Sequence, residues 1–223
     1  MSIKFYSILV MLLFITTTSI NSQSITLLLD PAEKSTHQAV GNLTEHAITI
    51  QLCQNLKKVL EHHYPSFKII ITPLVPELSQ PHKKASFANT LQPDLLLNFS
   101  CFYKAEGRPL LTIYHYGLQP ATDSLTVSHN YLSFIPYQKA YLKAFGCTKK
   151  IAHETLNFFN AEYKKNFECN AVYACPLLPL KGIMIPALTF EMGLQNSNDW
   201  KLFIEPLVEF VKRNVQFITD SKR

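Results

Sequence analysis

The sequence predicts an α/β fold: one domain with a twisted, mostly parallel sheet of about six strands and helices on both faces. Short apolar runs alternate with longer segments of helical periodicity, as in strand–helix–strand units. A length of 223 residues suits one sizeable domain, and 47% hydrophobic residues are enough for an ordinary core. Because no repeat or linker divides the chain, we expect residues 23–223 to form this domain.

The first half of the chain contains three expected strands separated by two helices. The strands are short and apolar, and the first two end at Pro31 and Pro73, which cannot continue a strand ladder. The longer helix carries apolar residues at helical spacing along one face. The strands are expected at residues 25–30, 67–72 and 94–100, and the helices at 43–60 and 83–89.

The second half contains two further expected strands and two longer helices. The first of these strands is a candidate edge strand, and the first helix has a weak point at Gly146. Two proline-containing stretches, 73–81 and 175–186, are expected to be surface loops. The strands are expected at 110–116 and 185–191, and the helices at 138–159 and 200–217.

The first 22 residues have the pattern of a secretory signal peptide. Lys4 precedes a short apolar run at 8–15, and small or polar residues follow at 16–22. The run is shorter than the roughly 20 residues that a membrane-spanning helix needs. We therefore expect an exported protein, periplasmic or extracellular, with no stable membrane span after cleavage. An uncleaved anchor is the alternative.

Charge and cysteine content narrow the function classes. The net charge of +5 is not concentrated in a basic cluster with interleaved aromatics, so nucleic-acid binding is not expected. Five cysteines leave at least one unpaired. The sequence contains no Cys-x-x-Cys pair, so a cysteine-based zinc site is not expected. Cys169 and Cys175 are close enough in sequence for a local disulfide. Cys53 and Cys101 lie in apolar segments, as core residues do.

Acidic residues follow two of the expected strands. Glu191 ends the strand at 185–191, and Asp30 and Glu33 follow the first strand. In open α/β sheets ligands bind outside the carboxyl ends of the strands, so these acids are candidates to meet in a crevice. A carboxylate there can act as a general acid or base. For Asp30 and Glu33 a solvated loop is the simpler alternative.

Glu45 has two interpretations. It lies three residues before Ile48 on the apolar face of its helix, where a lone carboxylate is costly to bury. This position favours a metal ligand or a paired acid. Asn42 and Glu45 also form a capping-box pattern, in which Asn42 caps the helix and Glu45, at the third helical position, bonds back to it.

Five segments follow one another in a distinctive order. Residues 29–35 (LDPAEKS) are close to an LDPGHGG turn, and Glu45 begins the first long helix. Residues 84–89 (KASFAN) are close to R-x-x-x-A-N, and residues 93–100 (PDLLLNFS) are close to A-D-L-F-I-S-I-H. Residues 186–194 (PALTFEMGL) are close to P-A-x-L-x-E-x-G-F. In this order the segments resemble the zinc-dependent N-acetylmuramoyl-L-alanine amidases that cleave bacterial cell wall.

The resemblance implies a metal site from which this chain departs. Such enzymes hold zinc with two histidines and one glutamate and leave a position open for the attacking water. Glu33 and Ser100 stand at the histidine positions, and a set of two carboxylates and a hydroxyl suits zinc poorly. The candidate site residues are Glu191 as the catalytic residue, Glu45 and Glu33 at metal positions with Ser100 at the third, and Asp30 and Asn89 for binding.

We therefore expect an amidase-like protein that has lost catalysis, needs no cofactor, and binds peptidoglycan fragments or a protein of the cell envelope. The alternative is an active, divergent amidase that hydrolyses the muramoyl–L-alanine amide bond with zinc. It would recruit His37 or His115 beside Glu45, with Glu191 as general base. A third hypothesis places the function in the aromatic and polar insert around residues 117–136.

Overall fold

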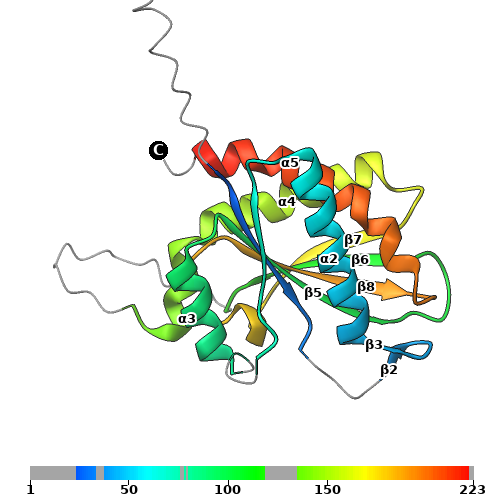
Figure 1. Ribbon diagram of the computed structural model, residues 1–223, viewed down its shortest axis with the longest axis horizontal. Coiled ribbons are helices and arrows are strands. Elements are labelled where there is room, and N and C mark those ends of the chain that lie inside the picture. Colours follow the sequence, from blue (N-terminus) through cyan, green and yellow to red (C-terminus); the bar gives the residue numbers. More distant parts are fainter. Residues whose placement is uncertain (1–23, 34–37, 76–77, 79, 119–134, 221–223) are drawn as a thin grey trace, which may run out of the picture.

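A six-stranded sheet with helices on both faces forms the centre of the protein (Figure 1). The computed structural model describes residues 24–33, 38–75, 78, 80–118 and 135–220. The strands of the sheet are β1 (Thr26–Pro31), β4 (Lys68–Ile71), β5 (Leu95–Tyr103), β6 (Leu110–Tyr116), β7 (Glu168–Cys175) and β8 (Ala187–Leu194). A separate hairpin consists of β2 (Gln38–Val40) and β3 (Leu43–Thr44).

Four neighbouring strands run parallel, which makes the sheet mostly parallel. The spatial order is β4-β1-β5-β8-β6-β7, and every pair from β4 to β8 is parallel. β6 is antiparallel to β8 and parallel to β7. The fold class predicted from the sequence is confirmed.

The two faces of the sheet bury two separate clusters of apolar residues. Leu27 and Leu29 of β1 belong to the larger cluster, and Leu28 between them belongs to the smaller one, because successive strand residues point to opposite faces. The larger cluster lies under α2 (Glu45–His63), α4 (Phe145–Glu162) and α5 (Ile204–Asp220), and the smaller one under α3 (Pro81–Leu91) and the 3-10 helices η2 (Tyr137–Lys143) and η3 (Leu178–Leu180).

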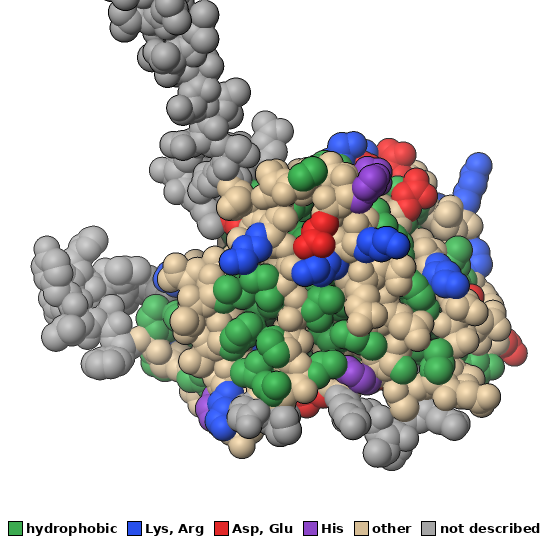
Figure 2. Space-filling view, in the orientation of Figure 1, with side chains coloured by type: hydrophobic (Ala, Val, Ile, Leu, Met, Phe, Trp, Pro, Cys, Tyr) green, Lys and Arg blue, Asp and Glu red, His purple; other side chains and the backbone are tan. Residues whose placement is uncertain are grey.

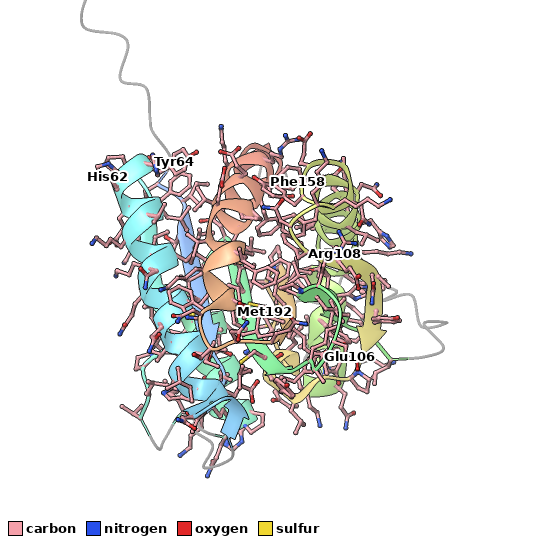
Figure 3. All side chains as sticks on the ribbon, turned by 90° about the vertical axis from the view of Figure 1, so that its right-hand side faces the viewer. His62, Tyr64, Glu106, Arg108, Phe158 and Met192 are labelled. Carbon is pink, nitrogen blue, oxygen red and sulfur yellow. The ribbon has the colours of Figure 1, made fainter. Side chains whose placement is uncertain are left out.

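The three helices over the larger cluster lie side by side, as Figure 3 shows. The guanidinium of Arg213 in α5 lies 4.2 Å from the ring centre of Phe158 in α4, which ties these two helices together at the surface. A further 3-10 helix, η4 (Asp199–Phe203), leads into α5. None of the helices in the described ranges is long and apolar enough to cross a membrane.

Two predicted elements differ from the structure, and one strand of the sheet is not predicted. β6 lies between β8 and β7, so the expectation of an edge strand at 110–116 is wrong. The sequence does not predict its outer neighbour β7, whose burial pattern does not alternate and whose register shifts at a bulge. The helix expected at 138–159 is divided, since residues 137–143 form a 3-10 helix and α4 begins at Phe145, next to the weak point at Gly146.

Cys169 and Cys175 are free thiols. Cys169 and Cys175 lie six residues apart on the extended strand β7. At about 3.3 Å per residue this separates them by roughly 20 Å, whereas a disulfide needs Cα atoms about 5.5–6 Å apart. The expected local disulfide is therefore wrong. Cys53 and Cys101 are buried core residues, as expected.

The edge strand β4 borders an apolar surface. Figure 2 shows hydrophobic side chains gathered between α3 and α2, with Lys and Arg side chains along one border. Leu74 and Val75, just after β4, are exposed. Lys57 of α2 donates from Nζ to the carbonyl oxygen of Ile69 at 2.8 Å, which occupies part of the open strand edge.

Candidate functional site

The candidate site lies at the carboxyl ends of β1, β5 and β8, where the strands have unequal lengths. β1 ends at Pro31, opposite Phe99 of β5, while β5 continues beside β8 as far as Tyr103. Even-numbered residues of β5 donate their N–H groups toward β8, so odd-numbered ones donate toward β1. Beyond Pro31 the Cys101 N–H therefore has no strand to bond with.

Glu45, the first residue of α2, fills this gap. Its Oε1 accepts a hydrogen bond from the Cys101 N–H at 3.0 Å. The N-cap of α2 is Thr44, whose hydroxyl oxygen accepts the Ala47 N–H at 3.1 Å. The capping-box interpretation, with Asn42 as the cap, is therefore wrong. Glu45 lies one residue past the cap rather than three, and its carboxylate bonds to a different element.

Glu191 lies next to the same gap, on β8. It is opposite Ser100 of β5. Its Oε2 accepts the hydroxyl of Tyr114, a residue of β6, at 2.8 Å. Burial, then the hydrogen bond and charge of Glu191, raise the pKa of Tyr114 far above its ordinary value, so the hydroxyl keeps its proton and remains a donor. The Tyr114 ring packs against Tyr173 of β7, with ring centres 5.7 Å apart.

The carboxyl groups of Glu45 and Glu191 are close enough to interact. The pKa of Glu45 is raised mainly by burial and also by the negative charge of Glu191, while the Cys101 N–H opposes part of this shift. Among the described residues, neither acid has a Lys or Arg nitrogen within ion-pair distance. The structure thus brings Glu45, Ser100 and Glu191 together at the carboxyl ends of β5 and β8. We call this acidic region, with the end of β1, the crevice.

A buried ion pair lies at the β1 side of this crevice. Asp30 is 1% exposed and Lys84 of α3 is 5% exposed, and the Lys84 Nζ lies 3.2 Å from Asp30 Oδ2. Lys84 also pairs with Glu33 Oε1 at 3.5 Å. Asn98 donates to Asp30 Oδ2 at 2.8 Å and accepts the Thr189 hydroxyl at 3.1 Å. Burial raises the pKa of Asp30, although Lys84 and Asn98 oppose the shift. Asp30 is thus a buried residue, and its binding role stays a prediction.

Asn89 lies at the opposite end of the sheet. Its side-chain amide donates to the Gly182 carbonyl oxygen and accepts the Met184 N–H, each at 2.8 Å. It lines a groove of about 420 Å³ together with Asp94 and Pro186, which immediately precede β5 and β8. The structure therefore does not bring Asn89 together with the acids of the crevice, and it uses both polar ends of this side chain internally.

The histidines considered as substitute metal ligands do not complete the site. His37 lies outside the described residues. His115 follows Tyr114 on β6, so its side chain points to the opposite face of the sheet. There its Nδ1 lies 3.1 Å from the Tyr116 carbonyl oxygen and its ring packs against Phe145. Burial lowers the pKa of His115.

The side chains at the three positions that correspond to the zinc ligands of the amidases do not fit a zinc site. Two of them already have partners, because Glu33 pairs with Lys84 and Glu45 accepts a backbone N–H. The third, Ser100, offers only a hydroxyl, which is a poor zinc ligand. Across the ranges that the structure describes, no group of three or more His, Cys, Asp or Glu side chains could hold a metal ion.

Four polar residues to which the sequence analysis assigns no role also belong to the site: Lys84, Asn98, Tyr114 and Thr189. The period of two along a strand relates Asn98 to Ser100 and Thr189 to Glu191, so this signal could have found them. The other two have partners 54 and 77 residues away in sequence, and no local pattern marks such pairs.

The fold is that of the catalytic domains of N-acetylmuramoyl-L-alanine amidases. The domain of CwlV from Bacillus (Paenibacillus) polymyxa var. colistinus matches with a TM-score of 0.60 and 9% identity, covering 86% of this chain and 98% of that one. The amidase from Clostridium difficile 630 matches with a TM-score of 0.57 and 14% identity, covering 87% of this chain and 98% of that one. The CwlD amidase from Clostridioides difficile, in complex with the GerS lipoprotein, matches with a TM-score of 0.51 and 12% identity, covering 88% of this chain and 99% of that one.

At these identities the likeness concerns the fold. No family model matches the sequence, and no curated protein matches it. The fold implied by the resemblance of the five segments is confirmed.

Proposed function

We propose that this chain is an exported, N-acetylmuramoyl-L-alanine amidase-like protein that has lost hydrolysis and acts by binding. Its ligand is peptide from the cell wall or, as the second candidate, a protein of the cell envelope. The proposal rests on one observation, which is what the side chains at the positions of the zinc ligands bind instead of a metal. Glu33 is paired with Lys84, Glu45 accepts the Cys101 N–H, and Ser100 stands at the third position.

Loss of the metal donors removes the means of activating water. A bound metal lowers the pKa of its water from about 15.7 to about 7, and a carboxylate alone does not produce a comparable nucleophile. Glu191 instead accepts the Tyr114 hydroxyl. This arrangement supports a role for Glu191 as a fixed hydrogen-bond acceptor for a ligand.

The surface of the crevice suits a peptide ligand. The carboxylates of Glu45 and Glu191 can accept hydrogen bonds from peptide N–H groups or amines. The ring of Phe102, a 38% exposed residue of β5, reaches within 3.0 Å of the position that a Cβ on Gly193 would occupy. Gly193 follows Glu191 by two residues on β8, so the ring lies on the same face of the sheet as Glu191. Exposed aromatic rings offer contact area for the carbon skeleton of a ligand.

Export is supported by two observations. Residues 1–22 have the pattern of a secretory signal peptide. Solved structures that share the fold include N-acetylmuramoyl-L-alanine amidases, and one of these amidases is in complex with a lipoprotein. A lipoprotein complex in that protein is also the reason to keep an envelope protein as the second candidate ligand here.

Metal content and turnover test the loss of catalysis. The protein is purified without chelators, its zinc is measured by mass spectrometry, and it is incubated with muropeptides whose products are separated by chromatography. We expect substoichiometric zinc and no released peptide. One equivalent of zinc together with released peptide would overturn the proposal in favour of the active, divergent amidase.

Calorimetry with the same muropeptides tests binding. Glu191→Gln should weaken binding about tenfold, as expected for one hydrogen bond to a charged acceptor. Glu209→Gln, at a half-buried position of α5, is the matched control and should bind like wild type. If wild type and Glu191→Gln bind equally, or neither binds, the crevice is not a site for cell-wall peptide. Calorimetry with a purified envelope lipoprotein then tests the second candidate ligand.

A further inference from the structure

Two carboxylates at the end of β1 share one buried cation. Asp30 is almost fully buried, and a buried carboxylate needs a proton, a metal ion or a basic side chain to offset the loss of water. Here the ammonium of Lys84 comes from α3, 54 residues away in sequence. It is itself more than nine-tenths buried and also pairs with the exposed carboxylate of Glu33.

The charge of Lys84 connects four elements. Its contact with Asp30 joins α3 to β1. The same Asp30 oxygen accepts the Asn98 amide of β5, and Asn98 accepts the Thr189 hydroxyl of β8. Without the ammonium, the carboxylate at one end of this row would keep only neutral donors. The row therefore depends on one positive charge.

The neighbouring segments are joined by direct hydrogen bonds rather than through a shared ligand. The His46 ring donates from Nδ1 to the Ala32 carbonyl oxygen at 2.6 Å, and the Ala32 N–H donates to the Thr49 hydroxyl at 3.1 Å. These contacts hold the turn after β1 against the start of α2. Glu45 then holds α2 to Cys101 of β5 at 3.0 Å. Hydrogen bonds thus already join the three segments that carry the positions of the amidase zinc ligands.

We propose that Lys84 is the resident cation of the crevice. Its ammonium neutralises Asp30 and Glu33 and holds the β1 side in place, so that the crevice keeps its shape without a divalent metal. This inference concerns how the crevice is held together and does not depend on which ligand binds there. It accounts for the mismatch between the family's zinc donors and the donors of this chain.

Thermal unfolding, followed by the fluorescence of the single tryptophan, Trp200, tests the role of the charge. Lys84→Met should lower the midpoint by roughly 6–20 °C, the range for breaking a buried ion pair in a domain of this size. Lys84→Arg keeps the positive charge, so its unfolding midpoint should fall much less. Lys212→Met removes an exposed partner of Glu209 and should leave the midpoint within about 2 °C of wild type.

Chemical rescue separates charge from packing. In Lys84→Ala, added propylammonium should raise the midpoint, while 1-propanol of the same size should not. Wild type should keep its midpoint when EDTA or zinc is added. Three results would each overturn the proposal: equal rescue by alcohol and amine, a wild-type midpoint that falls with EDTA, or Lys84→Met as stable as wild type. The EDTA arm needs no variant, so it decides even if a variant does not fold.

Discussion

Replacing Glu45 with alanine should destabilise the protein, whereas replacing it with glutamine should stabilise it at neutral pH. The Glu45 carboxylate accepts the Cys101 N–H at 3.0 Å, at a position that no strand reaches. Alanine leaves this donor unsatisfied, which costs about 1–3 kcal/mol. For a domain of this size that loss lowers Tm by roughly 2–12 °C. Glutamine keeps a carbonyl oxygen in the same place and removes the charge.

The sign of the glutamine effect follows from the raised pKa of Glu45. Burial and the charge of Glu191 raise this pKa above the ordinary value of 4.5, so the folded protein binds the proton more tightly than the unfolded chain. That contribution to stability is complete below the unfolded pKa and is lost as pH rises through the folded pKa. Glu45→Gln should therefore match wild type below pH 4.5 and exceed it above the raised pKa.

Urea unfolding monitored by Trp200 fluorescence, at several pH values, measures both effects. Glu209→Ala and Glu209→Gln, at a half-buried position of α5, are the matched controls and should change stability by less than about 0.5 kcal/mol. Glu45→Ala as stable as wild type below pH 4.5, where the charge effect is absent, would contradict the cost of the unsatisfied Cys101 N–H. The reasoning also fails if glutamine costs as much as alanine, because the position would then need a negative charge, as a metal ligand does.

Three further changes test other parts of the structure. Gly182 has φ of 82° and its Cβ would collide with the Tyr137 ring, so Gly182→Ala should cost about 1–3 kcal/mol in urea unfolding, and an unchanged midpoint would contradict this close approach. Thr44→Ala should cost about 1 kcal/mol by removing the cap of α2, with an unchanged denaturant slope; no loss would mean that another residue caps the helix. Burial lowers the pKa of His115, so wild type should lose stability as pH falls from 6.5 through that lowered pKa. His115→Leu should reduce this loss, and an identical pH profile would assign it to other groups.

The sequence predicts the sheet class because its central strands are buried on both faces and are therefore continuously apolar. β5 and β8 show this pattern clearly, and their predicted ranges agree with the observed bounds to within a few residues. β7 has only one neighbouring strand and exposes three of its eight residues, so its position depends on pairing with β6 rather than on its own composition. The short hairpin of β2 and β3 carries too few residues for a periodic signal.

The sequence predicts where the acidic residues of the site lie, but it does not predict which groups they bond to. The carboxyl-end rule places Glu191 at the same edge of the sheet as Asp30 and Glu33, and the family resemblance adds Glu45 to the site. The structure brings Glu45 close to Glu191. What each carboxylate bonds to depends on where β1 stops and on a tyrosine from a later strand. The Lys84 ion pair likewise depends on how α3 packs, which no local pattern encodes. The catalytic and metal roles of these residues stay predictions.

The position of β8 in the sheet affects when the protein can fold. β8 pairs with β5 on one side and β6 on the other, yet it comes after both, at residues 187–194 of 223. Until it is available, β5 and β6 each present an open row of backbone donors and acceptors. Because the sheet closes only around β8, a growing chain cannot form the complete sheet until residue 194 has been synthesised.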